Sequence, residues 1–294
     1  MTLKPNFFIP GAPKCGTTAL AAWLGEHPNI YLSPMKEPNF YCTDLRISNG
    51  RSRGEYERLF KGGGPAHLAI GEASVWYLYS RQAIQNILKE LPQAKFIVCL
   101  RNPVEMAYSL HGQHIMAANE HIKAFDRAWE AQSQRVQGEN ISRLCVDSKL
   151  LLYGPICKLG EQIERLYRIC HPDRIHAVFL DDIKADAGAE YLKVLKFLGV
   201  EDDGRMEFLV VNPASKRRFP RLHKAVKTLN MSRRRLGVPR IGTGVMRQLN
   251  RLNRRESERG GLDESTRSKL IAYFIADIEK LENLFGRDLG HWKG

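Results

Sequence analysis

The chain has 294 residues, of which 43% are hydrophobic, which is enough for one large domain or two small ones. It lacks the run of about 20 apolar residues that a membrane-spanning helix needs, and its first residues, MTLKPNFF, lack the pattern of a signal peptide. We therefore expect a cytoplasmic protein, with a peripheral position at a membrane surface left open.

The formal net charge of +13 is concentrated in one segment. Residues 216 to 259 contain fifteen Lys or Arg and two acids, while the rest of the chain is balanced. Such a segment favours an anionic ligand, an acidic acceptor or a membrane surface as its partner, although a solvated basic helix and loop is the simplest interpretation of most of these residues.

The six cysteines show no CxxC spacing, which argues against a zinc site and against a disulfide framework. We interpret them as buried thiols in their reduced form. Only Cys15, which lies in the glycine-rich turn, could have unusual reactivity.

Apolar runs and helical patterns alternate along the chain. Four nearly continuous apolar runs predict strands buried on both faces: 6–11, 67–72, 95–100 and 174–182. Apolar periodicity predicts helices over 18–26, 80–91, 104–116, 153–170 and 189–198. The alternation predicts a three-layer α/β fold with a central parallel sheet.

A boundary between the preceding part of the chain and the basic segment is expected near Asn212. After it, apolar residues recur at helical spacing over 264–284, so this last helix is expected to dock on the body. We therefore expect a single domain over 1–294, with the basic segment 212–260 inside it.

The stretch IPGAPKCGTT, residues 9 to 18, joins the first predicted strand to the first predicted helix. A glycine-rich turn in this position directs backbone N–H groups at an anion, which predicts a phosphate site. In the triphosphate form of such a loop, GxxxxGK[ST], a lysine follows the second glycine. Here Thr17 stands there and the lysine is Lys14, which speaks against a P-loop kinase that binds a metal–triphosphate complex.

A second phosphate element is predicted after the strand 95–100. Arg101 follows this strand at the carboxyl edge of the sheet, where ligands of open α/β sheets bind, and Ser109 comes about two helical turns later. Two such sites on neighbouring strand ends suggest a nucleotide that is phosphorylated at both ends of its ribose.

Six stretches together resemble a known family: PKCGTTAL, LSPMKEPNFY, GEASVWYL, FIVCLRNPVEMAYS, YGPICKLGEQIERLY and VLKFLGV. They are similar to the sulfotransferases that use 3′-phosphoadenosine 5′-phosphosulfate (PAPS) and release 3′,5′-bisphosphoadenosine (PAP). The closest subgroup is the bacterial enzymes related to heparan sulfate sulfotransferases. The resemblance covers about Asn6 to Val200 and resumes in LENLFGRDLGHW, and it implies a P-loop-like fold and no metal.

The resemblance also implies roles for single residues. The turn residues Lys14, Cys15, Gly16, Thr17 and Thr18 would bind the 5′-phosphosulfate. Arg101 and Ser109 would bind the 3′-phosphate.

For the proton transfer, the resemblance makes Glu37 the base that takes the proton of the acceptor. Lys36 would stabilise the sulfuryl oxygens or lower the pKa of Glu37. His111 and His114 are rival bases, because histidine titrates near neutral pH, but packing histidines on a helix are the simpler interpretation.

Two positions depart from the family pattern. Ala73 stands where a lysine usually follows the glutamate of the GE element, and Met106 replaces a second arginine. The 3′-phosphate could then use cations from the NPASKRRFP stretch, and we expect Lys216, Arg217 or Arg218 to serve.

The acceptor itself has no recognisable pattern. A carbohydrate, lipid or natural-product hydroxyl is expected, an amine less so. A nucleic-acid-binding module would account for the basic segment and would predict salt-sensitive binding to DNA or RNA, although no nucleic acid partner is expected. A peripheral membrane protein could use residues 232–255 as a surface anchor.

Overall fold

A computed structural model describes residues 4–48, 50–209, 215–217, 227–228, 254–256 and 260–294. The chain forms two compact units. The first comprises Met1–Ala107, Gly154–Val211 and Arg267–Gly294, and the second comprises Tyr108–Tyr153 and Asn212–Thr266. The expectation of a single domain over 1–294 stays a prediction.

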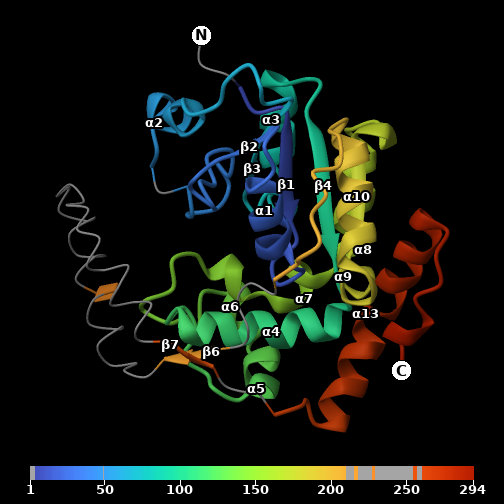
Figure 1. Cartoon of the computed structure of the whole chain (residues 1–294). Helices are drawn as coiled ribbons and strands as arrows, with labels where there is room; N and C mark the ends of the chain where they lie inside the picture. The colour runs from blue at the N-terminus through green and yellow to red at the C-terminus, as the bar shows by residue number, and fades with distance from the viewer. Residues whose placement is uncertain (1–3, 49, 210–214, 218–226, 229–253, 257–259) are drawn as a thin grey trace. The chain divides into compact units, whose positions relative to one another are not determined.

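The first unit contains a five-stranded sheet flanked by helices (Figure 1). Its strand order is β2-β3-β1-β4-β5, and every pair is parallel. The strands are β1 (Phe7–Gly11), β2 (Ile30–Leu32), β3 (Ala69–Ala73), β4 (Lys95–Leu100) and β5 (Ile175–Phe179). All residues of β1 and β3 are buried, as their apolar sequences require. The predicted α/β fold with a central parallel sheet is confirmed.

One strand was not predicted, and one strand prediction needs correction. β2 was not predicted, because its three residues, Ile30–Leu32, are too few to show a period. The strand predicted over 174–182 ends at Phe179, where α9 (Leu180–Ala185) begins. Asp181 and Asp182 occupy the first turn of this helix, where the positive end of the helix dipole favours acids.

The helices of the first unit mostly lie where they were predicted. They are α1 (Thr17–Gly25), α2 (Arg53–Glu57), α3 (Ala83–Glu90), α7 (Tyr153–Cys157), α8 (Leu159–Tyr167), α10 (Ala187–Leu198) and α13 (Glu264–Phe285). The single helix expected over 153–170 is instead α7 and α8, separated at Lys158. The reason is a long-range cap: the Asp277 carboxylate on α13 accepts the backbone N–H groups of Gly160 and Glu161 at 2.8 and 2.9 Å.

The last helix docks on the body, as predicted. Leu270, Phe274, Ile278 and Leu281 recur on one face of α13 and are fully buried. Two further apolar residues at this spacing, Tyr273 and Leu284, are not fully buried, and Tyr273 is 44% exposed.

The second unit contains α4 (Pro103–Met116) from Tyr108 onward, α5 (Phe125–Glu130), α6 (Gln132–Val136) and the antiparallel pair β6 (Ser215–Arg217) and β7 (Arg254–Glu256). Its core holds a buried ion pair between Arg135 and Glu120, at 2.7 Å. Tyr153 also donates to Glu120, at 2.9 Å.

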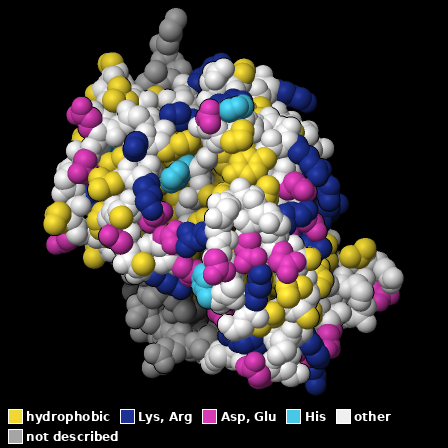
Figure 2. Space-filling model, turned by 90° about the vertical axis from the view of Figure 1, so that its right-hand side faces the viewer, with side chains coloured by type: hydrophobic (Ala, Val, Ile, Leu, Met, Phe, Trp, Pro, Cys, Tyr) yellow, Lys and Arg dark blue, Asp and Glu magenta, His cyan; other side chains and the backbone are white. Residues whose placement is uncertain are grey.

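No described helix is both long and apolar enough to cross a membrane. On the face drawn in Figure 2, acidic and basic side chains are interspersed. This agrees with the balanced charge of the chain outside residues 216–259.

Candidate active site

The turn between β1 and α1 lies at the carboxyl edge of the sheet. Gly11 ends β1 where a Cβ atom would lie 2.9 Å from the Cβ of Leu78, so only glycine fits there. Lys14 (φ 68°) and Gly16 (φ 86°) both have left-handed backbones, and α1 begins directly after Gly16. The first backbone N–H groups of a helix have no intrahelical acceptor, so Thr17 and Thr18 present theirs toward this turn.

The side chain of Cys15 lies in the protein interior. It is fully buried, with Sγ 3.5 Å from the Pro13 carbonyl oxygen and 3.8 Å from the Met106 sulfur. Burial raises the pKa of this thiol well above its usual range. The expectation of unusual reactivity is therefore wrong, because a buried thiol stays protonated and unreactive.

Arg101 joins the end of β4 to the same turn. Its Nη1 donates to the Lys14 carbonyl oxygen at 3.2 Å, and its Nη2 lies 3.8 Å from Glu105. Glu105 is in turn bound by Arg267 of α13 at 2.8 Å. The guanidinium is thus held beside the turn, partly exposed, and the two predicted phosphate elements of the first unit are in direct contact.

Lys36 and Glu37 lie in the segment after β2, half-exposed, and form an ion pair of 2.6 Å. The other carboxylate oxygen of Glu37 accepts the Val75 backbone N–H at 3.0 Å. The Glu37 backbone is left-handed, with φ 64°, and its N–H donates to the Ala73 carbonyl oxygen at 2.9 Å. The end of β3 therefore fixes both the backbone and the carboxylate of Glu37.

A buried carboxylate to which the sequence analysis assigned no role, the glutamate of the GE element, lies next to the carboxyl edge. Glu72 on β3 is completely buried and accepts three hydroxyl hydrogen bonds, from Tyr56 at 3.0 Å, Tyr77 at 2.7 Å and Ser74 at 2.7 Å. Burial raises its pKa to about 7. The available signal was a lone glutamate at the end of an apolar strand.

His111 and His114 are packing residues. Both are buried, and the rings of His111 and His114 pack against Tyr153 within the second unit. Burial lowers the pKa of His114 to about 3, which makes it a poor base at neutral pH.

The remaining predicted site residues belong to the second unit. Ser109 is half-buried on α4. Lys216 and Arg217 form part of β6, and Arg218 lies outside the described residues. Most of the basic segment also lies outside them.

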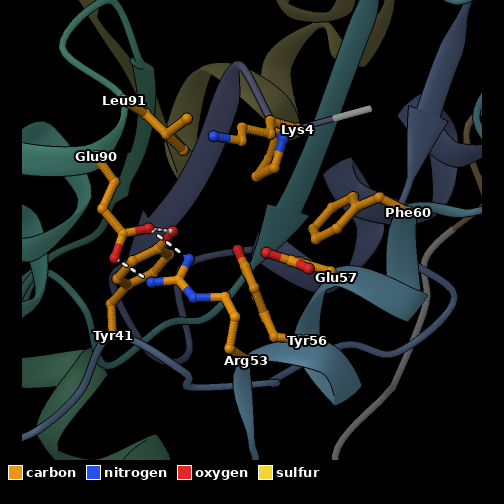
Figure 3. Close-up of a pocket in the computed structure, with 9 residues that line it drawn as sticks. Lys4, Tyr41, Arg53, Tyr56, Glu57, Phe60, Glu90 and Leu91 are labelled. Carbon is orange, nitrogen blue, oxygen red and sulfur yellow. Dashed lines mark hydrogen bonds and ion pairs between the residues drawn. The ribbon is translucent and has the colours of Figure 1, made fainter. Parts of the chain in front are cut away.

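A separate cavity of about 180 Å³ lies toward the amino ends of the strands (Figure 3). Tyr41, Tyr56 and Phe60 line it, and Arg53 lies beside Tyr41, with both of its terminal nitrogens bonded to Glu90. Lys4 and Leu91, which precede β1 and β4, complete its upper wall. Because the turn lies at the carboxyl ends, this cavity is distinct from the predicted phosphate site.

The profile of the sulfotransferase domain family matches residues 4–213 of the chain. The chain belongs to the sulfotransferase family. Both the turn and the segment of Lys36 and Glu37 fall inside the matched region, and the family indicates an enzyme that transfers sulfuryl groups.

Solved and curated relatives agree with this membership. The crystal structure of a sulfotransferase from Alicyclobacillus acidocaldarius has a TM-score of 0.73 and 24% identity, over 99% of this chain and 100% of that one, and so shares the fold. Carbohydrate sulfotransferase 15 of Mus musculus is 30% identical over 147 residues. The bifunctional heparan sulfate N-deacetylase/N-sulfotransferase 1 of Caenorhabditis elegans is 29% identical over 114 residues.

These curated matches are partial. They cover 36% and 38% of this chain, and only 26% and 13% of the mouse and nematode proteins. Within the described residues, no group of three or more His, Cys, Asp or Glu side chains could hold a metal ion.

Proposed function

We propose that the chain transfers a sulfuryl group from PAPS to a hydroxyl group of a carbohydrate, lipid or natural product, and less readily to an amine. The family supplies the reaction class. The donor is inferred from the turn after β1 and from the arginine after β4. A carbohydrate acceptor is supported by the named activities of the mouse and nematode relatives.

One observation carries the proposal: the carboxyl edge of a single sheet holds an anion-binding turn, an arginine and a paired carboxylate. Arg101 touches the turn through the Lys14 carbonyl. Glu37 is anchored to the end of β3 by the Val75 N–H and is paired with Lys36 at 2.6 Å. Ligands of open parallel sheets bind at this edge.

In the proposed reaction the acceptor oxygen attacks sulfur while the bond from sulfur to the 5′-phosphate oxygen breaks, and PAP leaves. Lys14 neutralises the charge that develops on the leaving phosphate. Backbone N–H groups at Gly16, Thr17 and Thr18, together with the dipole of α1, bind the same phosphate. Cys15 contributes its backbone only, since its thiol is buried.

Glu37 takes the acceptor proton in this mechanism. One of its oxygens is held by Val75, and the other is paired with Lys36. When the donor binds, Lys36 moves from Glu37 to the sulfuryl oxygens, and the released carboxylate oxygen becomes the base.

For the 3′-phosphate we propose Arg101, a cation that is half-buried and pre-oriented by Glu105. Ser109 and the cluster Lys216, Arg217 and Arg218 are proposed for the same phosphate on the sequence alone.

Isothermal titration with PAP, AMP and ATP, all in EDTA, tests the donor. Binding of PAP that is at least tenfold tighter than binding of AMP is expected, because a charge-assisted pair with a phosphate contributes more than about 1.4 kcal/mol. Equal affinities for PAP and AMP, or ATP binding that appears only with added Mg²⁺, would refute the proposal.

A further inference from the structure

Glu72 sits at the centre of a small hydroxyl network. Its two carboxylate oxygens accept hydrogen bonds from Ser74, Tyr77 and Tyr56, and no part of it is exposed. A buried carboxylate without a cationic partner is rare unless its hydrogen bonds serve a purpose.

The direction of two of these hydrogen bonds is fixed. The Ser74 hydroxyl oxygen accepts the Asn39 backbone N–H at 3.0 Å, and the Tyr77 hydroxyl oxygen accepts the Tyr41 backbone N–H at 3.3 Å. Each hydroxyl therefore has its own proton left to give to Glu72. Three hydroxyl groups donate hydrogen bonds to this one carboxyl group. This fits the ionised form of Glu72, because a carboxylate accepts hydrogen bonds and cannot donate them.

The two backbone N–H groups belong to the segment of the proposed base. Asn39 also donates through its side chain to the Glu37 carbonyl oxygen at 3.1 Å. Asn39 is itself in the left-handed region, with φ 51°. Its conformation and that of Glu37 are thus held by the residues around Glu72.

We propose that Glu72 is a positioning residue for Glu37: its ionised carboxylate orients Ser74 and Tyr77, which hold the backbone of Asn39 and Tyr41 and so keep the Glu37 carboxylate in place. The inference rests on the proposed function only in taking Glu37 as the base.

Protonation of Glu72 changes this arrangement. A proton on the Glu72 oxygen that faces Ser74 would reverse that bond, so the Ser74 oxygen would accept from both Glu72 and Asn39 and its own proton would lose Glu72 as acceptor. The groups that face Glu72 are Tyr56 from α2, Ser74 and Tyr77 after β3, and Tyr41, Cys42 and Glu37 after β2. None of these is a cation that would keep Glu72 ionised in acid, and burial raises its pKa to about 7. We therefore expect positioning to weaken as the pH falls below neutrality.

Hydrogen exchange followed by mass spectrometry tests the link between Glu72 and the segment of Glu37. The experiment needs no sulfuryl acceptor. The probe is the peptide segment 36–42, which contains the Asn39 and Tyr41 amides. Ser74→Ala and Tyr56→Phe each remove one hydroxyl from Glu72, but only Ser74 is bonded to this segment. We expect about tenfold faster exchange in Ser74→Ala, as the loss of a hydrogen bond implies, and unchanged exchange of this segment in Tyr56→Phe. Equal effects of the two variants would overturn the proposal.

A second experiment measures the same hydrogen exchange at different pH values. After correction for intrinsic exchange rates, protection of segment 36–42 in the wild-type chain should fall between about pH 8 and about pH 6. In Glu72→Gln it should be low and the same at both pH values. Protection that is independent of pH in the wild-type chain would contradict the role of the ionised form.

Turnover and PAP binding together distinguish a failure of this inference from a failure of the proposed function. With ³⁵S-labelled PAPS and N-desulfated heparin as the probe acceptor, Ser74→Ala should lower kcat while PAP affinity stays at the wild-type value. If the wild-type chain binds no PAP, the proposed function fails, and the exchange result still decides the structural link. If PAP binds and Ser74→Ala exchanges like the wild type, only the role of Glu72 fails.

Discussion

Glu37 uses both of its carboxylate oxygens before any substrate arrives, one on Lys36 and one on Val75. Glu37→Gln keeps the shape and the bond from Val75 but cannot accept a proton. We expect turnover to fall by about 10²- to 10⁴-fold, the usual contribution of a general base, with PAP affinity nearly unchanged. Steady-state kinetics beside calorimetry would show this. Normal turnover would mean that the base lies elsewhere.

Lys14 is expected to act on the leaving phosphate, so its loss should affect the reaction more than any surface lysine. Lys14→Ala should lower kcat by about 10²-fold or more, as removal of a transition-state charge partner does. Lys89→Ala, an exposed lysine near the end of α3, is the matched control and should leave kcat unchanged. Similar kcat values for Lys14→Ala and the wild type would exclude this role.

At this scale the place of a residue along the sheet could be predicted where it belongs to a short local pattern, while the roles of the site residues stay predictions. Lys14, Arg101, Lys36 and Glu37 each follow a strand within a few positions, and the structure places all four at one edge of the sheet. The hydroxyl network of Glu72 could not be found in this way, because one of its partners, Tyr56, lies sixteen positions earlier. The orientation of the Cys15 thiol was equally hidden, since it depends on Met106, ninety-one positions away.

The break between α7 and α8 shows how one element depends on another. Asp277 of α13 accepts the N–H groups of Gly160 and Glu161, as a capping residue would. A Cβ on Gly160 would lie 2.4 Å from the Asp277 carbonyl oxygen, so the two helices touch at this glycine.

Asp277→Ala should therefore destabilise the first unit by about 1–2 kcal/mol, the usual cost of losing a helix cap. Urea unfolding monitored by circular dichroism measures it. Glu279→Gln changes an exposed acid on the same helix and should have no such effect. If both variants unfold at the same urea concentration, the cap contributes nothing.

Helices with clear periodicity were predicted to within a few residues, and so were the strands of five or more residues. The sequence could not reveal that 153–170 is interrupted, because the cap comes from more than a hundred residues later. β2 has three residues and is recognisable only by its pairing with β3. Tertiary contacts, not local propensity, define both features.

The stability of the whole molecule should depend on pH through Glu72. Its pKa is about 7 in the folded chain, against an ordinary value of 4.5. The folded state therefore binds more protons between these values, and the free energy of unfolding falls as the pH rises through this window. The full shift corresponds to on the order of 3 kcal/mol.

Glu72→Gln should remove this dependence. The difference in unfolding free energy between wild type and variant, measured in urea from about pH 5 to about pH 8, should change steadily in favour of the variant. A constant difference would show that Glu72 does not titrate in this range. The ionised form of Glu72, which is proposed to position Glu37, is thus the form in which the fold is less stable.

The left-handed backbones at Lys14 and Glu37 have an evolutionary consequence. Non-glycine residues in this region cost roughly 1–3 kcal/mol where they are strained, and glycine would relieve both positions. A library randomised at these two codons and selected for thermal survival alone should accumulate glycine. The same library selected for sulfated product should keep lysine and glutamate, so the two enriched populations would diverge at the very positions that the proposed reaction needs.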